Sequence, residues 1–118
     1  MLSPILIAST DVHRQLLVMT VEGPMVDPDH VEALRMVLPA VPDGHSLIVD
    51  LTEATEFSPA ALATLRSVAR DAVDQGRTLV VVCGDLTRRT ELVLADLDTL
   101  VPVVEAVEQA LPLTRAAA

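Results

Sequence analysis

The segment SLIVDLTEATEFSPAAL, residues 46–62, carries the strongest indications of the fold. It begins with Ser46 to Leu51, whose nearly continuous apolar character is typical of a strand covered on both faces. The polar, acidic stretch Thr52 to Phe57 follows and predicts a loop. Ser58-Pro59 then combines a side chain that caps free amide groups with a proline suited to the first helical position. The segment therefore predicts a buried strand, a loop and a helix.

The predicted helix runs from Pro59 to about Gln75, and Gly76 closes it with a left-handed cap. Apolar residues recur at spacings of three and four, which predicts one inward face and one charged, outward face. The inward residues are Leu62, Leu65, Ala69, Ala72 and Val73, and the outward residues are Arg66, Arg70, Asp71 and Asp74.

Two strands are predicted near the start of the chain. The apolar segment Pro4 to Ser9 suits an edge strand, and the β-branched segment Gln15 to Val21 suits a central one. The polar residues Asp11 to Arg14 turn the chain between them, which favours a β-hairpin. Gly23-Pro24 is expected to end the second strand.

A helix is predicted between these strands and residue 46. Asp27 provides a cap and Pro28 a first helical residue, and the helix extends to about Val41. Pro42-Asp43-Gly44 then turns the chain. The apolar face of this helix consists of Val31, Leu34, Val37 and Leu38.

The last third of the chain repeats the alternation of strand and helix. Thr78 to Cys83 is rich in β-branched residues and predicts a strand, after which Thr87 caps a helix to about Asp96. Leu100 to Val104 predicts a short last strand, which Pro102 restricts to an edge position or a strand start. A closing helix extends through Leu111, and residues 112–118 form a frayed tail.

This order of elements predicts one α/β domain over residues 1–118, with a mixed, mostly parallel sheet of four to five strands and about four helices. In such sheets the functional edge lies at the carboxyl ends of the strands. Here that edge gathers Pro24 to Asp29, Thr52 to Ala60 and Gly84 to Arg88.

Composition excludes several classes of function. The net charge of -9 disfavours binding to nucleic acid and to anionic membranes, and Phe57 is the single aromatic residue available for base stacking. The single cysteine, Cys83, forms no intramolecular disulfide, which fits a reducing compartment. With no apolar run of membrane-spanning length and no secretory signal, the sequence predicts a cytoplasmic protein.

The sequence contains side chains that could react or bind a metal, but they lack the spacing of a catalytic or cofactor site. The four glycines are dispersed, which excludes a phosphate-binding loop, and His13, His30 and His45 form no ligand pair. Cys83 ends a buried strand and is interpreted as a core residue, with redox sensing as the alternative. We therefore expect no metal, no cofactor and no enzymatic activity.

Acidic residues crowd the predicted functional edge. Asp50, Glu53 and Glu56 follow the third strand, and Asp27, Asp29 and Asp85 belong to the same edge. Paired carboxylates suit a divalent cation or acid–base chemistry, but a solvated rim is the favoured interpretation in a chain with 17 acidic residues.

The order of elements and several local motifs resemble the STAS domain family, typified by the bacterial anti-sigma factor antagonists. The resemblance extends from Leu16 to Leu111. Gly23 and the helix segment Glu32-Ala33-Leu34-Arg35 resemble the family's "TGELD" loop and first helix. Residues 46–62 resemble a hydrophobic strand followed by an acidic loop and "F-x-D-S-S-G-L", and Gly76 to Cys83 resembles the entry "G-x-x-L-x-L-x-x".

The resemblance also locates a departure from the family pattern. In the antagonists, the second serine of that motif is phosphorylated by a kinase that is itself the anti-sigma factor. Aligned on Leu51 and Leu62, that serine corresponds to Ala60 and the following glycine to Ala61. The resemblance therefore implies an antagonist that is permanently unphosphorylated or a module that has lost this switch. Ser58 is a candidate substitute acceptor, although helix capping already accounts for it.

The resemblance implies a protein-binding function. The leading hypothesis is a regulatory module that binds an anti-sigma factor or related switch kinase. The alternative is a scaffold or small-ligand sensor that forms homodimers or binds other STAS proteins. The expected partner-binding residues are Asp27, Asp50, Thr55, Glu56, Phe57, Ser58, Ala60 and Ala61.

Overall fold

A five-stranded sheet forms the centre of the molecule in the computed structural model, which describes residues 5–11 and 15–115. The strand order is β1-β2-β3-β4-β5. β1 and β2 form the predicted antiparallel hairpin, whereas β2 to β5 are mutually parallel. The strand bounds are β1 Ile5–Asp11, β2 Leu16–Met25, β3 Ser46–Phe57, β4 Leu79–Val82 and β5 Val103–Val104. The predicted α/β class with a mixed, mostly parallel sheet is therefore confirmed.

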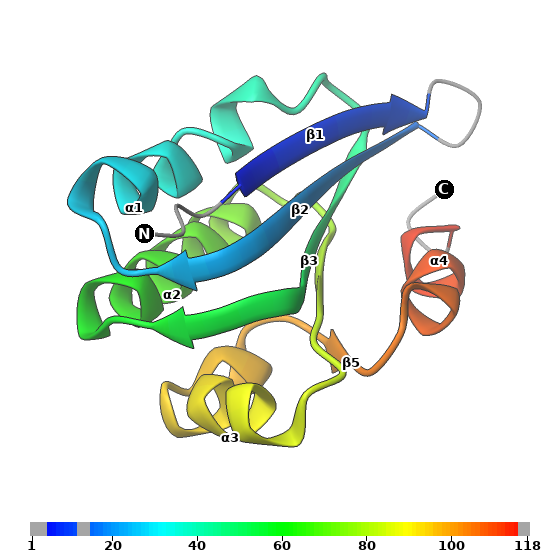
Figure 1. The fold of residues 1–118 in the computed structure, drawn as a ribbon. Coiled ribbons are helices and arrows are strands. Elements are labelled where there is room, and N and C mark those ends of the chain that lie inside the picture. The colour runs from blue at the N-terminus through cyan, green and yellow to red at the C-terminus, as the bar shows by residue number, and fades with distance from the viewer. Residues whose placement is uncertain (1–4, 12–14, 116–118) are drawn as a thin grey trace.

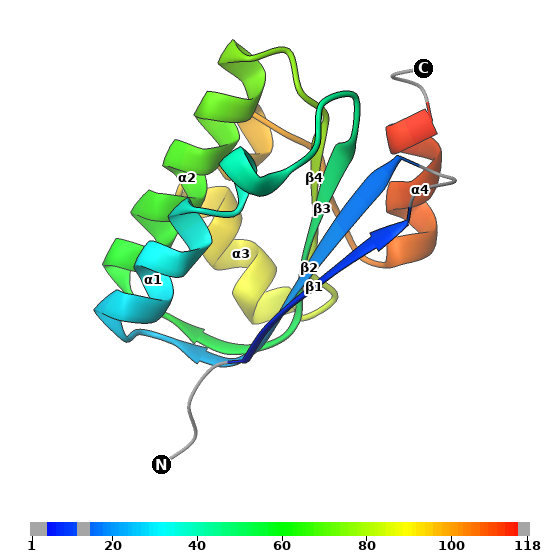
Figure 2. The same cartoon turned by 90° about the horizontal axis from the view of Figure 1, so that it is seen from above.

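Within residues 5–11 and 15–115, four α-helices flank the sheet, and they are divided unequally between its faces (Figure 2). α1 (Pro28–Arg35), α2 (Pro59–Asp74) and α3 (Leu86–Leu94) lie on one face. α4 (Val107–Arg115) lies alone on the other, against β3, β4 and β5. None of the described helices is long and apolar enough to cross a membrane.

Alternation along the strands produces a core on each face of the sheet. In β3, Leu47 and Val49 face the three helices, whereas Ile48 faces α4. The central strands are therefore buried on both sides, as their apolar composition predicts. The core beneath α4 contains Leu16, Ile48, Val80, Val82 and Ala110.

The first helix is shorter than predicted. α1 ends at Arg35, and the expected continuation to Val41 is replaced by a turn at Met36 and a 3₁₀ helix, Leu38–Ala40. Pro39 accounts for the difference. Its backbone nitrogen carries no hydrogen to donate, and its ring collides with the preceding turn of an α-helix. Val37 and Leu38 are nevertheless buried, as predicted.

The second strand does not end at Gly23-Pro24, as the sequence analysis expected. β2 continues through both residues to Met25, and Gly23 has a positive φ of 87°. Pairing with β1 reaches Glu22, so in the described residues Pro24 needs to pair only with β3. A proline is tolerated there because a one-sided strand does not require its missing donor.

The largest correction concerns residues 52–57. They form the second half of β3 and pair with β2 up to Met25–Phe57, whereas the sequence analysis predicted a loop. The β2–β3 register shifts between Thr20 and Glu22 and again between Gly23 and Pro24, and each shift adds one residue to β3. Two such bulges place Leu51, Ala54 and Phe57 on the buried side at a spacing of three. The alternation of apolar and polar residues that usually identifies a strand is therefore absent from this part of the sequence.

The later elements also depart from their predicted bounds. Asp85 caps α3 by accepting from the backbone amide of Arg88, so Thr87 is a helical residue and not the cap. α4 continues past Leu111 to Arg115 and contains Pro112, so residues 112–115 are helical and not a frayed tail. Val73 is exposed, although the sequence analysis placed it inward.

The remaining predicted boundaries agree more closely with the structure. Gly76 has the expected left-handed conformation, with a φ of 68°. β5 covers only the last part of the predicted segment from Leu100 to Val104 and follows Pro102 directly. Of the predicted hairpin turn, residues 12–14 lie outside the described residues, as do residues 116–118 of the tail.

Candidate functional site

The candidate site is built on the ends of β2 and β3, which continue as a two-stranded ribbon toward the starts of α1 and α2 (Figure 1). β4 pairs with β3 only as far as Asp50, so the second half of β3 pairs with β2 alone. The backbone amide of Ser58 donates to the carbonyl of Met25 at 3.1 Å. This bond fixes the start of α2 to the end of β2.

Exposed polar residues occupy the outer side of this ribbon. Leu51, Ala54 and Phe57 pack into the core, and the residues between them are exposed. These residues, which we call the acidic ledge, are Thr52, Glu53, Thr55 and Glu56.

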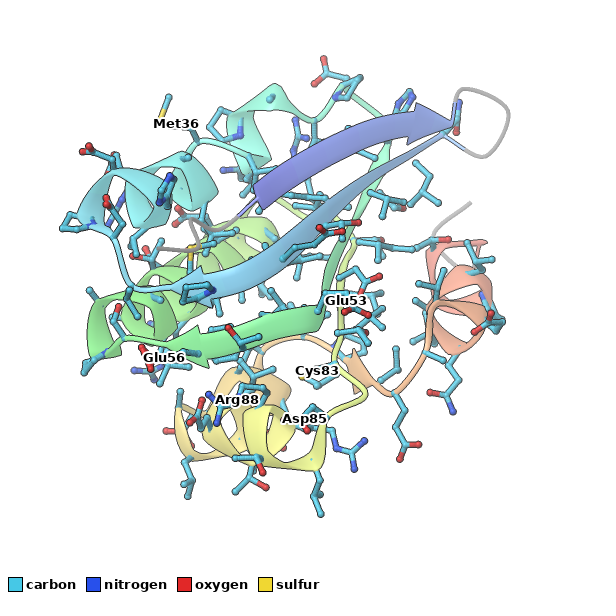
Figure 3. The ribbon with its side chains drawn as sticks, viewed as in Figure 1. Met36, Glu53, Glu56, Cys83, Asp85 and Arg88 are labelled. Carbon is cyan, nitrogen blue, oxygen red and sulfur yellow. The ribbon has the colours of Figure 1, made fainter. Side chains whose placement is uncertain are left out.

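Arg88 connects the acidic ledge to α3 (Figure 3). Its guanidinium donates to the carbonyl oxygen of Thr55 at 3.0 Å and forms ion pairs with Asp85, at 3.7 Å, and Glu91, at 3.4 Å. The side chain is only 17% exposed, so these contacts are partly shielded from water. Sequence analysis missed this residue: its spacing of three from both acids is visible, but its contact with Thr55 is not.

A shallow, open pocket of about 370 Å³ separates the ledge from α3. Its lining is mainly polar, which suits the side chains of a protein partner better than an apolar ligand. The lining residues are Thr52, Glu53, Ala54, Thr55, Asp85, Thr87 and Arg88.

Several acidic residues of this edge serve local structure. Asp27 accepts from the amide of Asp29 at 2.8 Å and caps α1, and Asp85 caps α3. Asp50 accepts from the amide of Thr52 at 3.0 Å, where the first bulge begins. Within the described part of the chain, no group of three His, Cys, Asp or Glu residues is placed to hold a metal ion.

Two glutamates of the ribbon are direct neighbours. Glu22 of β2 is the register partner of Glu53 of β3. Like charges in directly opposed positions destabilise a strand pair. The ribbon therefore carries adjacent negative charges on β2 and β3.

The start of α2 contains three of the residues that the sequence analysis singled out, Ser58, Ala60 and Ala61. The hydroxyl oxygen of Ser58 accepts from the amide of Ala61 at 3.1 Å, which confirms the predicted cap. Ala60 is exposed in the first turn, whereas Ala61 is fully buried. Phe57 is also buried, so Phe57 and Ala61 support the surface from beneath and do not form it.

Other residues singled out in the sequence lie apart from this surface. Cys83 is buried in the core, and its burial raises the pKa of the thiol, so the neutral form is favoured. His30 is in the first turn of α1 and His45 precedes β3, at opposite ends of the sheet. His13 lies outside the described residues.

Solved structures share this fold over nearly the whole chain. An anti-sigma factor antagonist from Mycobacterium paratuberculosis has a TM-score of 0.76 at 21% identity, covering 96% of this chain and 95% of its own. SpoIIAA, an anti-sigma factor antagonist in its unphosphorylated form, has a TM-score of 0.66 at 13% identity, with coverages of 94% and 98%. The STAS domain of a SulP transporter from Vibrio cholerae has a TM-score of 0.68 at 22% identity, with coverages of 83% and 79%.

Sequence comparison assigns the family independently of the structure. No curated protein matches the chain. The model of the STAS domain matches residues 8–110, which include β2 to β5, the acidic ledge and the start of α4. The resemblance found in the sequence is thereby confirmed, and the chain belongs to the STAS domain family.

Proposed function

We propose that this chain is a non-enzymatic regulatory module that binds an anti-sigma factor or related switch kinase and thereby releases a sigma factor. Membership of the STAS family and the fold shared with anti-sigma factor antagonists support this proposal. The exposed acidic ledge supports a partner surface with positive charge, because complementary charges steer association. The protein acts in the cytoplasm, where such partners reside.

The proposed binding face combines the acidic ledge with the start of α2. Asp27, Thr55, Glu56 and Ala60 are exposed there, while Asp50 and Ser58 are partly exposed beside them. Their backbone is held by the Ser58–Met25 bond and by Arg88. A face whose backbone is fixed before binding loses less conformational entropy when it docks.

The single observation that carries phosphorylation-independent binding is the exposed methyl group of Ala60 in the first turn of α2. A phosphate at this position would add charge and bulk to the binding face, and alanine offers no acceptor oxygen. The nearby hydroxyl of Ser58 already accepts a hydrogen bond from Ala61. We therefore propose that the partner cannot switch this module off by phosphorylating the start of α2.

The test is the affinity for a purified switch-kinase anti-sigma factor, measured by calorimetry with ADP and with ATP, alongside the intact mass. We expect binding with either nucleotide and no added phosphate. Ala60→Glu should weaken binding by about tenfold or more. The matched control is Ala63→Glu, one turn further along the exposed side of α2, which should bind normally. Absence of binding with both nucleotides, or loss of binding only after ATP, would refute the proposal.

The alternative is a STAS scaffold that self-associates or binds other STAS domains. The shared fold with a transporter STAS domain supports this second candidate, because it places the family in another setting. Sedimentation of the purified chain distinguishes the two: a stable dimer favours the scaffold, and a monomer that binds the switch kinase favours the antagonist.

A further inference from the structure

Helix α3 presents apolar residues to solvent along its outer face. Leu86 is 68% exposed, Val93 44% and Leu94 79%. Spacings of seven and eight residues place Val93 and Leu94 two turns beyond Leu86, on the same side of the helix. Thr90 lies between them, and we call these four residues the α3 stripe.

The centre of the α3 stripe has no unsatisfied polar group. The hydroxyl of Thr90 donates to the carbonyl oxygen of Leu86 at 2.8 Å, within the helix itself. Its polar atom is thereby turned to the backbone. The stripe is therefore a continuous apolar line along two turns of α3.

The fold does not require this stripe for its own packing. α3 is held to the rest of the domain by its opposite side, where Leu92 is fully buried and Arg88 bonds to Thr55. A contiguous exposed apolar surface rimmed by polar residues marks an interaction site in soluble proteins. Isolated exposed residues such as Met36 need no such explanation.

The charges around the stripe are mainly acidic. Both arginines of α3 are neutralised, Arg88 by Asp85 and Glu91 and Arg89 by Glu105 at 3.0 Å. Asp96 and Asp98 lie just beyond the end of α3, two and four residues after Leu94. A second copy of this chain would bring the same acidic rim and a net charge of -9, which disfavours self-association.

We propose that the α3 stripe docks an amphipathic helix of a partner protein whose apolar line is flanked by Lys or Arg. Its apolar line covers Leu86, Val93 and Leu94, and its cations approach Asp96 and Asp98. This surface is separate from the start of α2, so it gives the module a second contact and does not depend on the proposed function.

The test uses the full chain and two synthetic helical peptides with the same leucine line, one flanked by lysines and one by glutamates. Fluorescence anisotropy should detect binding of the lysine peptide only, weakened by salt. Leu86→Gln/Leu94→Gln should weaken that binding by about tenfold, because both residues are exposed and the variant keeps fold and charge. The matched control Met36→Gln/Val73→Gln, also at exposed apolar positions, should bind as the unmodified chain does.

Amide chemical shifts locate the bound peptide and separate this proposal from the previous one. Changes should concentrate on residues 86–94, and Ala60→Glu should leave peptide binding intact. Equal binding of both peptides, no binding of either, or unchanged binding to the Leu86/Leu94 variant would overturn the proposal. A dimer in sedimentation that the same variant abolishes would assign the stripe to a second copy instead and would also overturn it.

Discussion

The two halves of β3 are one strand in different surroundings. Ser46 to Leu51 lies between β2 and β4, and its side chains pack into both cores of the domain. Thr52 to Phe57 pairs with β2 alone and buries only every third residue. The first half is therefore stabilised by burial in both cores, whereas the second is stabilised by pairing with β2, by burial of every third side chain and by a few polar contacts.

This difference shows how the domain combines a buried centre with an exposed candidate site. Two bulges re-aim the chain, so that the acidic residues of the second half reach solvent while Ala54 and Phe57 remain anchored. Arg88 and the Ser58–Met25 bond compensate for the missing neighbour strand.

The largest effect is expected in the first half of β3. Ile48→Ala should lower the free energy of unfolding by about 3 kcal/mol, because it leaves a cavity at a fully buried side chain under α4. Urea titration measures the change. The control in the second half is Thr55→Ala, which should change stability by less than about 0.5 kcal/mol. Similar losses in both variants would show that the two halves are equally important for packing.

A smaller and more local effect is expected for Arg88. Arg88→Ala should lower stability by about 1.5 kcal/mol, since it removes a charge-assisted hydrogen bond from a partly shielded site. Hydrogen exchange should accelerate in residues 52–57 and remain unchanged in residues 46–51. The control is Arg35→Ala, which removes an exposed pair with Glu32 and should have little effect. Uniform acceleration along β3 would contradict a local role.

The junction between β3 and α2 provides the next test. Ser58→Ala should lower stability by about 1 kcal/mol, because the amide of Ala61 loses its capping oxygen. Ser58→Asp should restore most of that loss, since aspartate caps equally well. Thermal unfolding of the unmodified chain and the two variants measures these changes. An equal loss in both variants would mean that Ser58 does not stabilise the protein by capping α2.

Removing the repulsion between Glu22 and Glu53 should have a small stabilising effect, opposite in sign to the previous variants. Glu53→Gln should raise the free energy of unfolding by about 0.3 kcal/mol, because it removes the like charge opposite Glu22. Glu56→Gln, whose register partner is Pro24, is the control and should be neutral. The gain should shrink in high salt, and a gain that salt does not change would exclude an electrostatic origin.

The ionisation of Cys83 should affect stability only at alkaline pH, because the thiol stays neutral at pH 7. Burial raises its pKa in the folded protein, so the folded state holds its proton more tightly than the unfolded chain. Stability from this group is therefore fully present below the unfolded pKa of about 8.5 and falls as pH rises above it. Cys83→Ala should show a shallower loss of stability from pH 8 to pH 10. Equal slopes would mean that the thiol does not contribute.

Local signals in the sequence were sufficient for most of the architecture. Ser58-Pro59 and Asp27-Pro28 marked the starts of α2 and α1 correctly, because capping depends on neighbouring residues. The apolar segments around Val49 and Val81 identified the central strands, because a strand buried on both faces must be apolar throughout. The same motifs were also sufficient to recognise the STAS family.

Only the tertiary structure decided the form of the candidate site. Thr52 to Phe57 resembles a loop in the sequence, because bulges replace the period of two with a spacing of three and are fixed by the pairing with β2. The role of Arg88 depends on Thr55, which lies 33 residues away along the chain and adjoins it only after folding. Contacts of this kind depend on how separate elements pack, so the local sequence determined the elements and the packing of those elements determined the surface.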